Sequence, residues 1–299
     1  MKFERLGGLI AAPFTPFHED GSLNLELIPR YAAHLAETGV SGAFVCGTTG
    51  EGPSLSVGER KQVAEAWVKA APASVKVIVH TGHNCLADAC ELAKHAQEIE
   101  AAATSLTSPS FFKPGNIRDL MDTCALVAAA APELPFYYYH IPSMTGVSLP
   151  VPDFLKAAKD VIPNLAGIKF THESLMDYAN AVRMEEGRFD VLFGRDEMLL
   201  GSLTVGAKGA VGSTYNYIAP IFIRLLAAYR AGDLVAAEAE QAKANEVIGV
   251  MIRYGGLPAG KAIMKLMGVD CGPVRLPLRS LAMQQVEAMA QELEQVGFK

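Results

Sequence analysis

Short apolar segments recur along the chain, and most are followed by a segment in which apolar residues repeat with helical period. The helical segments include Ser56–Ala71, Ala87–Gln97, Ile117–Ala131 and Ser174–Glu186, the first with a possible Ser56/Glu59 capping box. This alternation predicts an α/β fold, a (β/α)8 TIM barrel. The expected strands are Leu9–Phe14, Val40–Cys46, Val75–His80, Ala102–Thr107, Leu134–His140, Ala166–Phe170, Asp190–Phe193 and Gly209–Gly212.

An open, doubly wound sheet is the main alternative for such an alternation. The sequence has no GxGxxG motif after a strand and no GxxxxGK[ST] motif, and their absence weakens this alternative. Helical period returns after the eighth strand, in Pro220–Tyr254, Ala259–Met267 and Leu281–Val296. We therefore expect one domain over residues 1–299. Residues 1–218 would form the barrel core, and residues 219–299 would form the last barrel helix and C-terminal helices packed on the barrel.

Composition narrows the possible partners. Half of the 299 residues are hydrophobic, 19% are charged, and the net charge of −6 argues against nucleic acid but not against a small anionic substrate. No apolar run is long enough to cross a bilayer, so no membrane partner is expected. The N-terminal segment lacks a signal-peptide pattern, and the five cysteines form no CxxC pair. A reduced, cytoplasmic protein is expected.

Polar residues follow five of the expected strands at their carboxyl ends. In a barrel these ends share one rim, where barrel enzymes place their chemistry. Side chains from separate strands should therefore converge on one mouth. They are Thr48, Thr49 and Glu51 after the second strand, Tyr139 and His140 at the fifth, Lys169 and Thr171 at the sixth, Asp196 and Glu197 after the seventh, and Ser213 and Thr214 after the eighth.

Lys169 ends an apolar strand in the segment GIKFT. Burial would lower its pKa and yield the neutral amine that a Schiff base requires. The alternative is a lysine at a strand end that reaches solvent. Side chains alternate along a strand, so Lys169 and Thr171 should face the same way.

Tyr139 closes the segment FYYYHIP, where alternation puts Tyr137 and Tyr139 on one face and Tyr138 on the other. A phenol beside an iminium can relay a proton, although all three tyrosines could be core aromatics. The GTTGEG segment at residues 47–52 offers backbone N–H groups and two hydroxyls that suit a carboxylate, or it is a tight turn. Asp196 could bind hydroxyls or cap a helix over Glu197–Val205.

The seven histidines are scattered and form no HExxH motif. His80 and His83 could ligate a metal, but no carboxylate lies near them at ligand spacing. No metal site is therefore expected.

Six motifs together resemble the dihydrodipicolinate synthase and N-acetylneuraminate lyase family of class I aldolases, from about Leu6 to the C-terminus. The GSTYNY, PSFFKP and YYYHIP segments resemble its animal-type lyases in particular. The motifs are GTTGE at Gly47–Glu51, PSFFKP at Pro109–Pro114, YYYHIPSMTGV at Tyr137–Val147, GIKF at Gly167–Phe170, GRDE at Gly194–Glu197 and GAVGSTYNY at Gly209–Tyr217.

The resemblance implies a Schiff-base aldolase that cleaves N-acetylneuraminate to N-acetylmannosamine and pyruvate. It implies Lys169 as the Schiff-base lysine, Tyr139 as the proton relay assisted by Thr48, and Thr48 with Thr49 as the carboxylate site. It also implies a homotetramer that acts on small 2-keto sugar acids without metal or organic cofactor. The alternative is a sibling aldolase or dehydratase on another 2-keto acid, such as a dihydrodipicolinate synthase. For the lyase, the resemblance implies that the hydroxyls of the sugar substrate would bind to Thr171, Gly194, Asp196, Glu197 and Ser213.

Three departures from the family pattern bear on specificity. Phe111 and Phe112 stand in the loop where some members bring a tyrosine hydroxyl from a neighbouring subunit. Met144 stands where dihydrodipicolinate synthases usually carry an arginine for a second carboxylate. Tyr254 and two following glycines stand where lyases often have a bulky residue near the N-acetyl group.

Overall fold

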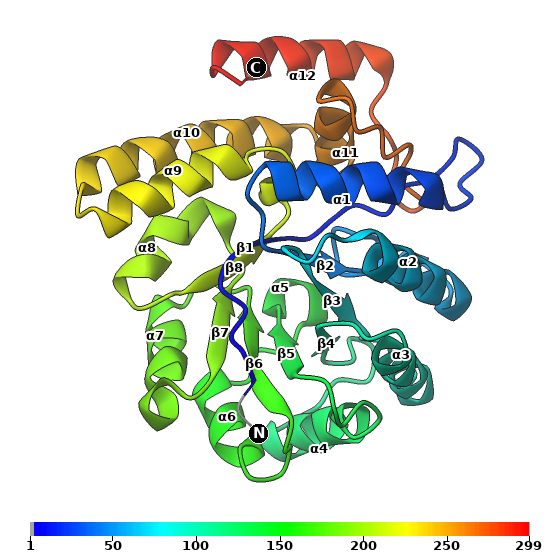
Figure 1. The fold of residues 1–299 in the computed structure, drawn as a ribbon, viewed down its shortest axis with the longest axis vertical. Coiled ribbons are helices and arrows are strands. Elements are labelled where there is room, and N and C mark those ends of the chain that lie inside the picture. The colour runs from blue at the N-terminus through cyan, green and yellow to red at the C-terminus, as the bar shows by residue number, and fades with distance from the viewer. Residues whose placement is uncertain (1–2, 299) are drawn as a thin grey trace.

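The computed structural model describes residues 3–298, and its eight parallel strands close into a barrel in sequence order (Figure 1). Pairing of β1 with β8, in the register Gly8 to Gly209, completes the closure. The predicted TIM barrel is therefore confirmed. The strands are β1 Gly8–Ala11, β2 Gly42–Val45, β3 Lys76–His80, β4 Ala103–Thr107, β5 Phe136–His140, β6 Leu165–Phe170, β7 Asp190–Phe193 and β8 Gly209–Gly212.

Helices surround the barrel, and α9 to α12 gather on one side of it, at the top in Figure 1. Ser56 and Glu59 form the predicted capping box of α2. The helices are α1 Ile28–Glu37, α2 Val57–Ala70, α3 Leu86–Glu98, α4 Ile117–Ala128, α5 Pro142–Thr145, α6 Val151–Ala158, α7 Leu175–Arg183, α8 Leu199–Thr204, α9 Ala219–Arg230, α10 Leu234–Arg253, α11 Leu257–Leu266 and α12 Met283–Gln295.

Some elements end earlier than the sequence pattern suggests. Strand β1 stops at Ala11, two residues before Pro13, which has no N–H to donate to a ladder. The helical pattern over residues 220–254 is two helices, because Gly232 takes a φ of +79° between them. Helix α7 ends at Arg183, and Glu185 and Glu186 follow with positive φ.

The barrel has an interior core and an outer core. Tyr137 and Tyr139 pack inside with Ile10 and Phe44, whereas Tyr138 packs outside against the helices, as strand alternation predicts. The outer core continues into the C-terminal helices, where Val247, Ile263 and Met289 are buried in the same cluster. Within residues 3–298, none of the helices has the length and apolar character that a membrane span requires.

Gly167 in β6 offers a test of this packing. A Cβ there would overlap the backbone of Asp190 in β7, which cannot move without breaking the barrel. We expect Gly167→Ala to lower the free energy of unfolding by about 1–3 kcal/mol or more. Gly58→Ala in α2 is the matched control. Apart from chain neighbours and the backbone of its own helix, no atom lies within 4 Å of its added Cβ, so the control should not lower the free energy of unfolding. Urea unfolding measures both, and a neutral Gly167→Ala would contradict this packing.

Candidate active site

Lys169 lies on β6 inside the barrel and is only 4% exposed, so it does not reach solvent. Its Nζ lies 3.8 Å from the ring centroid of Phe44 and 3.9 Å from that of Tyr139. Burial among these rings lowers the lysine pKa to about 7, while the nearby Asp196 carboxylate opposes the shift. A substantial fraction of the amine is therefore neutral near pH 7 and able to act as a nucleophile.

Tyr139 places its phenol between Lys169 and the loop after β2. The phenol oxygen lies 3.5 Å from Oγ1 of Thr48, and the ring packs edge-on against Phe44 and His80. Burial raises the pKa of Tyr139, while the Thr48 and Thr171 hydroxyls partly oppose it. The phenol therefore carries its proton at neutral pH and can exchange it with a hydroxyl.

Thr171 and Gly194 meet at the ends of β6 and β7. A side chain at position 194 would overlap the Thr171 hydroxyl, so glycine allows the two segments to approach. Within residues 3–298 the Thr171 Oγ1 is buried without a hydrogen-bond partner. An unpaired hydroxyl near the Tyr139 phenol can bind a polar ligand group.

Asp196 follows β7 in a short 3-10 turn, Asp196–Met198, and is 5% exposed. Its carboxylate accepts hydrogen bonds from the Thr214 N–H (3.0 Å) and hydroxyl (2.6 Å). A side chain at Gly212 would overlap this carboxylate. The helix-cap interpretation is wrong, because α8 starts at Leu199 and Asp196 bonds across to the loop after β8.

Burial raises the pKa of Asp196 to about 6, Glu197 adds to the rise, and Thr214 and Lys169 oppose it. The carboxylate and the Lys169 amine thus influence each other. Asp196 keeps the lysine pKa from falling further, and Lys169 keeps the carboxylate more ionised.

Three predicted residues stand at the rim. Thr49 and Ser213 are half-buried, and in the described part of the chain their hydroxyls form no hydrogen bond. Glu197 pairs with Arg195 at 3.3 Å, and Arg195 also contacts the Glu173 carboxylate. These contacts thus join Lys169 with five of the predicted residues, whereas Thr49, Glu197 and Ser213 surround them. The five are Tyr139, Thr48, Thr171, Gly194 and Asp196.

Part of the wall around Lys169 was not predicted from the sequence. Arg60 of α2 is buried and donates to the carbonyls of His80 (2.5 Å) and Gly82 (2.8 Å), which fixes the end of β3. The His80 ring stacks on Phe44, and burial holds its pKa well below the usual value, aided by Arg60 and Lys169. His80 is therefore neutral. Strand alternation could have placed Phe44 beside Lys169, but Arg60 carries no local signal.

One group of potential metal ligands stands after β3. His83, Cys85 and Asp88 bring ligand atoms within 4.8 Å of one another, and His83 Nδ1 lies 3.4 Å from the Asp88 carboxylate. The expectation that no carboxylate lies near His83 is wrong, because the first turn of α3 brings Asp88 back to it. His80 is not part of this group, since its ring packs on Phe44 inside the barrel.

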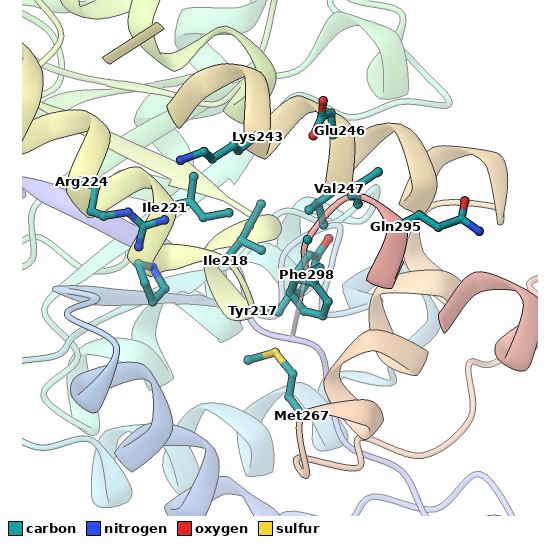
Figure 2. Close-up of a pocket in the computed structure, with 13 residues that line it drawn as sticks. Tyr217, Ile218, Ile221, Arg224, Lys243, Glu246, Val247, Met267, Gln295 and Phe298 are labelled. Carbon is teal, nitrogen blue, oxygen red and sulfur yellow. The ribbon is translucent and has the colours of Figure 1, made fainter. Parts of the chain in front are cut away.

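A large cavity lies elsewhere, between α9, α10 and the C-terminal segment (Figure 2). Its volume is about 730 Å³, and its walls include Ile221, Val247, Met267 and Phe298. None of the predicted site residues lines it. The Tyr254 phenol donates to the Glu292 carboxylate of α12 at 2.7 Å.

The lysine pKa can be measured directly. We expect the reactivity of Lys169 toward trace acetic anhydride, read by peptide mass spectrometry, to be lost as the pH falls through about 7. The amine is protonated and inert below its pKa, which lies well under the usual 10.5. Asp196→Asn should move the midpoint to lower pH, because the Asp196 charge raises the lysine pKa. A midpoint near 10 would contradict this account of the site.

Comparison with known proteins agrees with this geometry. N-acetylneuraminate lyase of Rattus norvegicus is 44% identical over 301 residues, which cover 99% of this chain and 94% of that protein. The solved structures of Proteus mirabilis and Aliivibrio salmonicida N-acetylneuraminate lyase each have a TM-score of 0.96 at 45% identity. Both alignments cover 99% of this chain, with 100% and 99% of those chains. The Dihydrodipicolinate synthetase family profile matches residues 5–296. The chain belongs to the dihydrodipicolinate synthetase family.

Proposed function

We propose that this protein is a class I aldolase that reversibly cleaves N-acetylneuraminate to N-acetylmannosamine and pyruvate. The observation that carries the proposal is the buried Lys169 amine, with a pKa of about 7, against the Tyr139 ring, whose phenol lies 3.5 Å from the Thr48 hydroxyl. Relatives bearing the lyase name match nearly the whole chain, which supports the same substrate.

The first step is imine formation. The neutral Lys169 amine adds to the C2 ketone of the open-chain sugar acid, and loss of water leaves an iminium. Burial contributes by keeping part of the amine unprotonated. The substrate carboxylate would lie against the Thr48 and Thr49 hydroxyls of the glycine-flanked loop.

Cleavage follows from the iminium, which accepts the electron pair of the C3–C4 bond. The C4 hydroxyl proton passes to the Tyr139 oxygen as the phenol's own proton moves through Thr48 toward the substrate carboxylate. The bond breaks to give N-acetylmannosamine and an enamine. Protonation of the enamine at C3 and hydrolysis then release pyruvate and restore Lys169.

The polar groups on the far side of Lys169 suit a hydroxylated substrate. Asp196 and Glu197 accept hydrogen bonds, and the unpaired Thr171 hydroxyl can donate one. Arg195 does not supply a free cation for a second carboxylate, because Glu173 and Glu197 both pair with it. Met144, 65% exposed in α5, also offers no donor. These features disfavour aspartate semialdehyde, the partner of the dihydrodipicolinate synthase reaction.

Product analysis on one preparation tests the proposal. We expect kcat/KM for pyruvate release from N-acetylneuraminate, measured with a chelator present, to exceed that for condensing pyruvate with aspartate semialdehyde. Lys169→Arg should abolish both activities, because a guanidinium stays protonated. A clear preference for aspartate semialdehyde would refute the lyase assignment and leave the Schiff-base chemistry standing.

Tyr139→Phe separates imine formation from bond cleavage. The variant keeps the ring that packs on Lys169 but loses the phenol that lies 3.5 Å from Thr48. We expect it to bind pyruvate covalently while its cleavage rate falls by roughly 10²–10⁴-fold. Rapid-quench measurement of each step provides the comparison. Near wild-type turnover would remove Tyr139 from proton transfer.

We also propose that the protein works as a homotetramer in a reducing cytoplasm. All five cysteines are unpaired, which suits that compartment. Exposed apolar side chains such as Phe111 and Phe112 are candidates for burial between subunits. Light scattering of the native protein would test the subunit number, and a monomer would refute it.

A further inference from the structure

A second lysine is as deeply buried as Lys169, but none of the steps above uses it. Lys261 of α11 has a side chain 3% exposed, with its Nζ 2.9 Å from the Glu51 carboxylate and 2.6 Å from the Pro273 carbonyl. The Nζ also lies 4.3 Å from the Phe17 ring centroid. The buried ammonium and the buried carboxylate need each other as partners, because either charge alone would be costly to bury.

Glu51 is the last residue of the GTTGE segment, and its side chain is 1% exposed. Its backbone takes a φ of +53°, a left-handed conformation that side-chain-bearing residues rarely adopt. Its backbone N–H donates to the Thr48 carbonyl at 3.1 Å. Its second carboxylate oxygen accepts a hydrogen bond from the backbone N–H of Arg275 at 2.8 Å. Both carboxylate oxygens are therefore tied to the C-terminal segment, while the backbone is tied to Thr48.

A surrounding layer of contacts makes this attachment stiff. The Arg275 guanidinium pairs with Glu59 and donates to the Ser54 and Gly21 carbonyls. It also lies 4.4 Å from the Phe17 ring centroid, so that ring has contacts with two cations. The loops after β1 and β2 are thus joined to the segment that follows α11.

We propose that Glu51 and Lys261 are positioning residues that hold Thr48 and Thr49 in place for the 2-keto acid carboxylate. Neither touches substrate. They act through the backbone of the loop, whose two hydroxyls lie two and three residues before Glu51. This inference rests on the proposed function, and it gives the C-terminal helices a role in substrate binding.

The test compares Glu51→Gln and Lys261→Met in the condensation direction. The pyruvate carboxylate binds the loop, whereas the sugar binds the opposite side, so only one KM should change. We expect the KM for pyruvate to rise roughly ten-fold or more, with the KM for N-acetylmannosamine and kcat within about three-fold of wild type. Lys265→Met is the matched control. It lies one turn further along α11, its side chain is 61% exposed, and its partner Asp270 lies 2.8 Å away. It should change neither KM.

The double variant Glu51→Gln with Lys261→Met keeps the test valid if a single variant folds poorly. It leaves no unpaired buried charge, so it should recover thermal stability relative to Lys261→Met while retaining the raised KM for pyruvate. A KM for pyruvate at the wild-type value, or an equal rise in both KM values, would overturn the proposal.

Failure of the proposed function gives a different result. If wild-type protein does not turn over N-acetylneuraminate, the pyruvate concentration that half-saturates borohydride inactivation replaces KM. The same roughly ten-fold rise is then expected for Glu51→Gln and Lys261→Met but not for Lys265→Met. An unchanged value in all three variants, or no inactivation of the wild type, would overturn the positioning role.

Discussion

The proposed active site depends on an amine that lies on a barrel strand, is buried, and has no hydrogen-bonded counter-ion within residues 3–298. An ammonium ion in such a place loses its hydration, so the balance shifts toward the neutral form. Phe44 and Tyr139 pack against Nζ. The neutral His80 ring stacks on Phe44 and meets Tyr139 edge-on. Asp196 is close enough to limit the shift without pairing directly with the lysine. The resulting pKa of about 7 lets one side chain alternate between proton carrier and nucleophile.

The barrel allows this lysine to be buried because the polar side chains of the site come from several strand ends and each has its own place around the amine. Lys169 lies opposite Tyr139 in the β5–β6 register, and this pairing brings the phenol to the amine. Glycines at 194 and 212 leave space for Thr171 and Asp196 where those strands end. The loop that carries Thr48 and Thr49 follows the end of β2, and the buried Glu51–Lys261 pair links this loop to α11.

Sequence periodicity was enough to predict the barrel and its eight strands, because those features repeat locally. It left open whether Lys169 is buried or reaches solvent, and the structure shows that it is buried. Gly232 also marks the break in the last helical pattern, because glycine readily adopts the positive φ found there. Long-range pairs could not be predicted in the same way. Arg60 on the end of β3, Thr214 on Asp196 and Lys261 on Glu51 join segments with no shared period. Each depends on three-dimensional closure of the barrel.

Trapping with pyruvate and borohydride tests the central claim most directly. Reduction of the iminium converts it to a secondary amine, which peptide mass spectrometry can locate. The account predicts a single modified residue, Lys169, and loss of activity in proportion to its modification. Modification of another lysine, such as the equally buried Lys261, or no pyruvate-dependent modification at all, would contradict it.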